Sequence, residues 1–317
     1  MKASHHPDYV LPLPEGHPFP MGKYARLHAL LLERGVLSPA DLMQPDEAAR
    51  EDLARVHDER YLDTLFGPGP TPTEQRRIGV PWSPRLLRRS RLAVQGTIDA
   101  ARAALAQGIA GNLAGGTHHA FAGHGEGFCL LNDVAVAIRV LQAGREIAHA
   151  LVVDLDVHQG NGTAAIFAGD ASVFTFSMHG ERNYPAVKQR SSLDVGLPDG
   201  VGDAAYLEAL GMNLPTILRS FDADMVFYLA GVDVASGDRY GRFALSDDGV
   251  RARDRLVVDA VRDASLPLVL ALAGGYAPSA ARTAELHALA FEEAVARERR
   301  DAAALRAQRA GAAPGPE

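Results

Sequence analysis

Residues 151–162, LVVDLDVHQGNG, begin as an apolar segment and then carry Asp154, Asp156 and His158 at alternate positions. Residues two apart on an extended backbone point to the same side, so Asp156 and His158 share a face. Asp233, which follows another apolar segment, could supply a third ligand for a divalent metal. Three protein ligands and an open position for water are typical of a catalytic zinc site. A pair that only caps the strand end is the simpler alternative, and the additional Asp233 favours the metal site.

Two adjacent histidines, His118 and His119, follow the glycine pair in GGTHHA. Each neutral imidazole needs a partner that fixes which ring nitrogen carries the proton. Asp154 and Asn161 are available as partners. Tyr276 also follows two glycines, where its hydroxyl could approach a carbonyl group at the metal. The alternative is that the paired histidines have no catalytic role.

Apolar segments that predict strands are each followed by such polar residues. The segments span residues 110–114, 149–155, 172–177, 225–230 and 267–272. Amphipathic helices are predicted between them at residues 83–107, 132–142, 204–219 and 247–263. Strands that alternate with helices predict a parallel sheet covered on both faces, and in such folds ligands bind at the carboxyl ends of the strands. The ionisable residues are therefore expected to meet at one edge of the sheet.

The chain is predicted to form a single domain over residues 1–295. The proline- and glycine-rich residues 66–84 are expected to form a long surface loop rather than a domain boundary. Residues 296–317 are expected to be a helix that ends in a disordered tail.

The composition excludes several classes of protein. A net charge of −7 argues against direct binding of nucleic acid, which would show a basic patch. No apolar stretch is long enough to span a bilayer, and the N-terminus lacks the apolar run of a signal peptide. The single cysteine, Cys129, excludes an internal disulfide and is compatible with a reducing compartment. We therefore expect a cytoplasmic protein that does not bind membranes.

Six motifs resemble those of a known family. GGTHHA, GEGFCLLND, DLDVHQGNG, FSMH, AGVDVASGD and GGY occur in the order and spacing of the zinc-dependent histone deacetylases. GHPFPMGKYARL and GDRYGRFALSDDGV are most similar to the class IV branch and its bacterial relatives. The resemblance extends from His17 to Tyr276. It implies the arginase-deacetylase fold, an α/β domain of three layers (α/β/α) around a mainly parallel eight-stranded sheet.

The resemblance implies a metal centre with catalytic residues around it. The implied ligands of zinc, or of iron(II) in its place, are Asp156, His158 and Asp233. The implied catalytic residues are His118, His119 and Tyr276. Asp154 matches the partner of His118, whereas Asn161 stands where many class I members carry an aspartate. His119 is thus left without a carboxylate partner.

The resemblance also implies a substrate channel and a second cation site. The residues that match the channel are Gly127, Phe128 and Tyr184. The residues that match a structural potassium (K+) site are Asp154, Asp156, His158, Ser177 and Met178.

The implied activity is hydrolysis of the amide of an acyl-lysine side chain in a protein, or of an acylated small amine. The acyl group would be acetyl or longer, and the class IV resemblance favours longer groups. His119 is the favoured proton shuttle, His118 would give electrostatic support, and Tyr276 would donate to the oxyanion of the transition state.

Three different functions remain possible. One is that of a deacetylase of acetyl-polyamines or of another small-molecule amide. Another is that of a two-metal ureohydrolase, which would need extra carboxylates where this chain has Gln159 and Val234. The third is that of a non-catalytic acyl-lysine binder, although such proteins usually lose a ligand or the tyrosine. The sequence makes no prediction of the oligomeric state.

Overall fold

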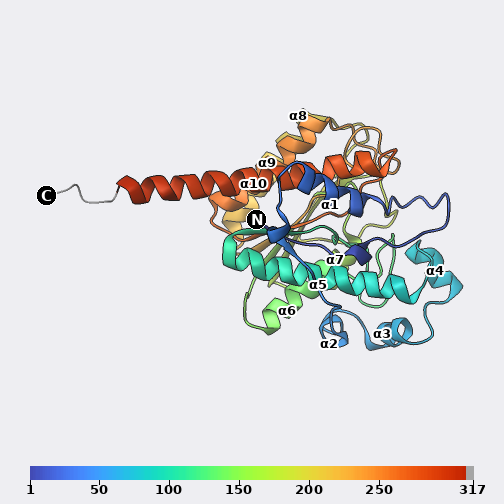
Figure 1. Cartoon of the computed structure of the whole chain (residues 1–317). Helices are drawn as coiled ribbons and strands as arrows, with labels where there is room; N and C mark the ends of the chain where they lie inside the picture. The colour runs from blue at the N-terminus through green and yellow to red at the C-terminus, as the bar shows by residue number, and fades with distance from the viewer. Residues whose placement is uncertain (312–317) are drawn as a thin grey trace.

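An eight-stranded sheet forms the centre of the molecule in the computed structural model, which describes residues 1–311 (Figure 1). The strand order is β2-β1-β3-β8-β7-β4-β5-β6, and all of these pairings are parallel. The strands are β1 (Lys2–Ser4), β2 (Leu42–Met43), β3 (Ile109–Asn112), β4 (Ala150–Asp154), β5 (Val173–Gly180), β6 (Leu193–Leu197), β7 (Met225–Leu229) and β8 (Leu268–Ala271). The prediction of a parallel α/β sheet is confirmed.

Helices cover both faces of the sheet. The helices on one side are α1 (Lys23–Glu33), α5 (Pro84–Gln107) and α6 (Asp133–Ala143), and those on the other are α8 (Asp203–Ser220) and α9 (Asp247–Asp263). In β4, Val152 packs into the apolar core of the first side, and Leu151 and Val153 pack into that of the second. This alternation produces the three layers, because successive side chains of a strand point to opposite faces.

The last helix, α10 (Ala280–Gly311), contributes to both apolar cores. Phe291 packs with the first core, and Leu289 and Ala290 pack with the second. The C-terminal half of α10 extends beyond the rest of the molecule (Figure 1). The predicted helix after residue 295 is thus present, whereas the predicted disorder at its end falls on residues 312–317, which lie outside the described residues.

The short elements lie mainly in the first third of the chain. They are the 3₁₀ helices η1 (Pro7–Tyr9) and η2 (Pro39–Asp41) and the helices α2 (Arg50–Leu53), α3 (Glu59–Phe66), α4 (Pro72–Ile78) and α7 (Asn161–Ile166). None of the helices in the described part of the chain has both the length and the apolar character needed to cross a membrane.

The prediction of a loop throughout residues 66–84 is wrong, because α4 forms within this segment. Thr71 and Glu74 form a capping box: the Thr71 backbone N–H donates to Glu74 Oε2 (2.7 Å), and Glu74 N–H donates to Thr71 Oγ1 (3.4 Å). Pro72 opens the helix, where its missing N–H costs no hydrogen bond, and Gly79 ends it with a left-handed backbone. Local capping therefore outweighs the high proline and glycine content.

The topology brings the polar segments together at one edge of the sheet. β4, β7 and β8 are neighbours in the strand order. Because these strands are parallel, the segments that follow them leave the sheet at the same edge. Those segments carry Asp156 and His158 after β4, Asp233 after β7 and Tyr276 after β8.

Candidate metal centre and catalytic site

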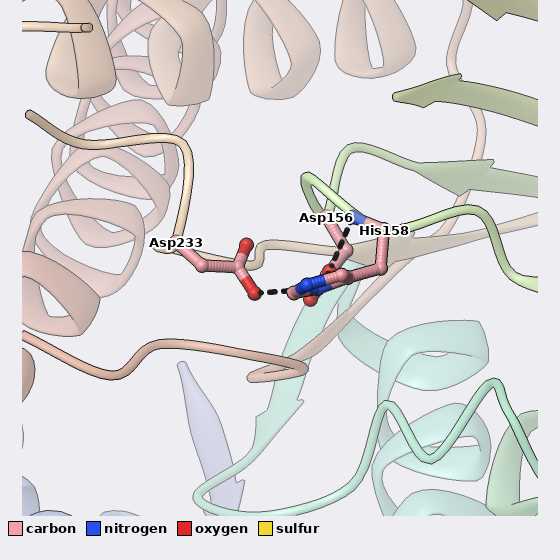
Figure 2. Close-up of side chains that lie close together, drawn as sticks. All are labelled: Asp156, His158 and Asp233. Carbon is pink, nitrogen blue, oxygen red and sulfur yellow. Dashed lines mark hydrogen bonds and ion pairs between the residues drawn. The ribbon is translucent and has the colours of Figure 1, made fainter. Parts of the chain in front are cut away.

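Three buried side chains converge at the carboxyl ends of β4 and β7 (Figure 2). The Nδ1 atom of His158 lies 2.9 Å from Asp156 Oδ1 and 3.2 Å from Asp233 Oδ2. One ligand atom from each residue lies within 4.8 Å of the others. The structure thus brings together the three predicted metal ligands.

The cluster has the charge and the free atoms that a cation requires. Asp233 Oδ2 is buried and, apart from the 3.2 Å ion-pair contact with His158 Nδ1, has no hydrogen-bond partner among the described residues. Burial, followed by the negative charge of Asp156, raises the pKa of Asp233 to about 7. Buried carboxylates side by side are costly unless a positive charge compensates them. The donor set of two carboxylates and one imidazole therefore fits a divalent transition metal.

Gly274 lets the β8 loop approach the cluster closely. Its N–H donates a 2.6 Å hydrogen bond to Asp156 Oδ2. A Cβ atom at this position would lie 2.6 Å from Asp156 Oδ2 and even closer to Asp233 Oδ2. Any larger residue would therefore displace the ligands.

The two adjacent histidines have different partners. His118 Nδ1 lies 2.7 Å from Asp154 Oδ2, and His119 Nδ1 lies 2.7 Å from Asn161 Oδ1. The ring centroids of the two histidines are 4.1 Å apart. Both predicted pairings are present in the structure.

These partners separate the pKa values of the two rings. Burial lowers the pKa of His118, but the charges of Asp154 and Asp156 outweigh burial and raise it to about 9. For His119, burial and the neighbouring His118 hold the pKa well below its usual value. The pKa values of the two rings are therefore shifted in opposite directions: His118 binds a proton more readily than an ordinary histidine, and His119 less readily.

A channel of about 270 Å³ leads from the surface to this cluster. It is lined by Arg77, Ile78, Gly79, His119, Gly127, Phe128, His158, Tyr184, Tyr240 and Tyr276. The predicted channel residues Gly127, Phe128 and Tyr184 are thus all in its wall. The Tyr184 ring stands perpendicular to the His119 ring, at 89° and with centroids 5.0 Å apart.

Gly127 and Phe128 both have left-handed backbones, with φ of 55° and 68°. A Cβ atom on Gly127 would lie 2.6 Å from His119 Cδ2, so only glycine fits beside this ring. The turn directs the Phe128 ring to 5.8 Å from the Tyr276 ring.

Tyr276 is buried beside the cluster, with its ring centroid 6.5 Å from that of His158. Its backbone N–H donates to Asp238 Oδ2 at 2.6 Å, which fixes the loop after β8. Burial and the charges of Asp233 and Asp156 hold the pKa of the phenol well above its usual value. Tyr276 is therefore a neutral hydrogen-bond donor.

A second, smaller cavity of about 30 Å³ continues behind the metal ligands. Its wall includes Asp156, His158 and Tyr276, and it extends towards Phe19, Tyr24 and Arg89. The cavity is thus much smaller than the channel of about 270 Å³.

The residues of the predicted potassium site lie at the end of β4, in the segment that follows it and in the neighbouring strand β5. Asp154 at the end of β4 pairs in register with Ser177 of β5, and Met178 follows Ser177. The N–H of Asp156 donates to Asp154 Oδ1 at 3.2 Å, and His158 follows two residues later. Binding of potassium here remains a prediction.

Sequence reasoning missed several residues around the channel. Glu126 accepts hydrogen bonds from Asn161 and from the Tyr184 hydroxyl. Arg77 and Tyr240 line the channel, and Lys23 is buried with its Nζ 5.7 Å from the centre of the Tyr276 ring. Glu126, Lys23 and Tyr240 lie within motifs that signalled the family, but the motifs alone did not indicate their contacts.

Comparison with known proteins identifies similar sequences. A family model described as the histone deacetylase domain matches residues 17–291. Histone deacetylase 2 of Arabidopsis thaliana is 33% identical over 84% of this chain and 71% of its own length. A probable deacetylase of Methanothermobacter thermautotrophicus is 31% identical over 88% of this chain and 87% of its own. An uncharacterized protein of Picosynechococcus sp. is 50% identical over 86% of this chain and 91% of its own.

The fold is similar to that of a solved structure. The HD domain of HDA15 superposes with a TM-score of 0.77 and 25% sequence identity. The match covers 93% of this chain and 90% of the HDA15 chain. With the all-parallel eight-stranded sheet, this match confirms the predicted arginase-deacetylase fold.

Proposed function

Because the chain belongs to the histone deacetylase family and is thus a hydrolytic deacetylase, we propose that it removes acyl groups from lysine side chains of proteins with the help of zinc. The observation that carries this proposal is the set of side chains at the inner end of the channel. There His158 of the metal cluster, His119 and Tyr276 all face the same cavity.

Asp156, His158 and Asp233 would hold the zinc ion. When bound, the ion polarises the substrate carbonyl and lowers the pKa of water towards about 7. Iron(II) suits the same ligands, so the choice of zinc rests on the family resemblance.

His119 is the proposed proton shuttle. Its Nδ1 faces Asn161, so its Nε2 is the nitrogen that can take a proton from the attacking water and return it to the leaving amine. His118, held as a cation by Asp154, supplies positive charge beside the developing oxyanion. Tyr276 donates a hydrogen bond to that oxyanion.

The channel fits the aliphatic stem of lysine between aromatic walls. The rings of Phe128, Tyr184 and Tyr276 supply apolar surface along its length. The one charged side chain that the described channel wall carries, other than histidine, is the Arg77 guanidinium. A cation at this place disfavours the positively charged acetyl-polyamines, so acyl-lysine in a protein is the preferred substrate.

The small cavity behind the metal ligands favours acetyl and other short acyl groups. Its volume of about 30 Å³ is a small fraction of the 270 Å³ of the channel. Packed interiors resist even one extra methylene. We therefore propose a preference for short chains, against the expectation of longer ones drawn from the class IV resemblance.

A two-metal ureohydrolase and a non-catalytic acyl-lysine binder have less support. The ureohydrolase would need a second set of ligands, and within the described residues the one cluster of three such side chains is Asp156, His158 and Asp233. The binder would have no use for the histidine pair and Tyr276. Membership of the class IV branch and a cytoplasmic location are parts of this proposal that rest on sequence alone.

A substrate panel on zinc-loaded protein tests the proposal. It should include peptides with acetyl-, butyryl-, octanoyl- and myristoyl-lysine, together with acetyl-spermidine. We expect kcat/KM to be highest for acetyl- or butyryl-lysine and to fall steeply for longer chains. A kcat/KM that rises with chain length, or a clear preference for acetyl-spermidine, would contradict the corresponding part of the proposal.

A further inference from the structure

The carboxylate of Glu126 lies directly behind Asn161, the partner of His119. Glu126 Oε1 accepts a hydrogen bond from Asn161 Nδ2 at 3.0 Å and another from the Tyr184 hydroxyl. The other oxygen, Oε2, lies 3.6 Å from His124 Nε2. Glu126 is 19% exposed and Asn161 only 2%, so water competes little for the contact between them.

The contact with Glu126 decides which way the Asn161 amide faces. A carboxylate can only accept hydrogen bonds, so it must meet the amide NH₂ group rather than the amide oxygen. With Nδ2 turned to Glu126, the amide oxygen Oδ1 faces His119 Nδ1 at 2.7 Å. That nitrogen must then carry the proton of the neutral ring, which leaves Nε2 free to accept one.

The opposite orientation of the amide would disable the base. It would bring the amide oxygen against the carboxylate of Glu126, two acceptors with no proton between them. It would also bring the NH₂ group against His119 Nδ1, which would then have to lose its proton to Nε2. Without Glu126, the contact between Asn161 and His119 would allow either orientation of the amide.

A tight turn holds Glu126 in place. Glu126 N–H donates to Cys129 C=O at 2.9 Å, and Cys129 N–H donates to Glu126 C=O at 2.8 Å. The two residues between them, Gly127 and Phe128, have positive φ, as in a type I′ turn. Phe128 N–H also donates to Ile78 C=O at the end of α4 (2.7 Å). These backbone hydrogen bonds to Cys129 and to Ile78 therefore fix the turn that carries Glu126.

We infer that Glu126 is a positioning residue, which orients the Asn161 amide and thereby sets the tautomer of His119. An aspartate at position 161 would place a carboxylate directly against His119. In this chain the carboxylate of Glu126 acts on His119 through Asn161 instead. The inference rests on the proposed deacylation, since it concerns the shuttle of that reaction. A purely structural alternative is that Glu126 only holds Tyr184 and the turn.

The effect of Glu126→Ala in the parent enzyme and in the Asn161→Asp variant distinguishes the positioning role from the purely structural one. In the parent enzyme, loaded with zinc and tested on an acetyl-lysine peptide, Glu126→Ala should lower kcat about tenfold to a hundredfold, with a smaller change in KM. In the Asn161→Asp background the same change should not lower kcat, because a carboxylate has no NH₂ group to turn to His119 and the loss of Glu126 removes a repulsion between two acceptors. An equal loss in both backgrounds would overturn the inference in favour of the structural role.

The ring nitrogens of His119 give a readout that does not depend on turnover. In zinc-loaded protein with ¹⁵N-labelled histidine, we expect the parent to show a protonated Nδ1 and an unprotonated Nε2. Glu126→Ala should shift the proton wholly or partly to Nε2, and an unchanged Nδ1–H signal would refute the inference. If no acyl-lysine peptide is hydrolysed, the deacylase proposal fails while this measurement still decides the role of Glu126.

Two controls complete the experiment. Tyr184→Phe removes the hydroxyl from Glu126 but keeps the contact to Asn161, so the Nδ1–H signal of His119 should persist. Loss of the signal in this variant would show that Tyr184, rather than Glu126, sets the tautomer. Glu208→Ala removes an exposed carboxylate of α8 and should leave kcat unchanged.

Discussion

His118 and Asp154 form a buried pair in which the Nδ1 atom lies 2.7 Å from Oδ2, and both side chains are only 4% exposed. The adjacent His119 has a neutral amide as its partner instead. The pKa values of these neighbouring rings are therefore shifted in opposite directions, which suits His118 to electrostatic support and His119 to proton transfer. The roles proposed for His118 and His119 rest on this difference.

His119→Ala should be the more damaging of the two histidine substitutions. It removes the group that moves the proton, and positioned acid–base groups typically contribute about 10²–10⁴-fold to rate. His118→Ala removes a charge but leaves the shuttle in place, so kcat should fall less. Steady-state kinetics on an acetyl-lysine peptide measures both, with zinc content as the control. A clearly larger loss of kcat for His118→Ala would show that His118, rather than His119, is the proton shuttle.

Tyr276→Phe should lower kcat about 100- to 1000-fold, because one donor to the oxyanion is lost. KM should change little, since this hydrogen bond strengthens only in the transition state. Tyr276 is not one of the three candidate metal ligands, so the zinc content of the variant should equal that of the parent. Turnover near that of the parent enzyme would remove Tyr276 from the mechanism.

His57 should make the fold less stable at mildly acid pH. The ring is buried, with Nδ1 3.1 Å from Phe121 C=O and Nε2 accepting from Asn132 N–H at 3.0 Å. Burial lowers its pKa from 6.5 to about 4. The unfolded chain therefore binds this proton more readily, so stability is full above about pH 6.5 and is lost as pH falls towards 4.

Urea unfolding of the metal-free protein measures this loss, which should amount to about 2 kcal/mol at pH 5. The matched variant His57→Gln has no group that titrates in this range. It should be less stable than the parent at pH 7.5 and should show a correspondingly smaller loss on acidification. The same pH dependence in both proteins would exclude His57 as the cause.

Much of the fold is predictable because its central elements are long and strongly patterned. The helix expected at residues 247–263 has the bounds of α9, and each of the five expected strands overlaps an observed one. β2 has only two residues, and β6 alternates half-buried with exposed residues, so neither gives an apolar run. α4 was missed although Thr71 and Glu74 signal its start.

The site was predictable where motifs fix the residues, and less so where contacts depend on turns. The metal ligands and the pairing of His119 with Asn161 follow from the family resemblance. Glu126 does not, because its contact depends on the turn through Gly127 and Phe128 and on where Tyr184 lies after β5. Contacts between segments that are far apart in the sequence leave no local sequence pattern from which they could be predicted.

The central claim, that one metal ion serves the reaction, is tested most directly by titrating metal-free protein with zinc. Hydrolysis of an acetyl-lysine peptide should rise linearly with added zinc and reach its plateau at about one ion per chain, because the described residues offer one cluster of three ligands. Asp233→Ala should abolish the tight binding that produces this break. A plateau at about two ions per chain, or full activity without added metal, would contradict the account.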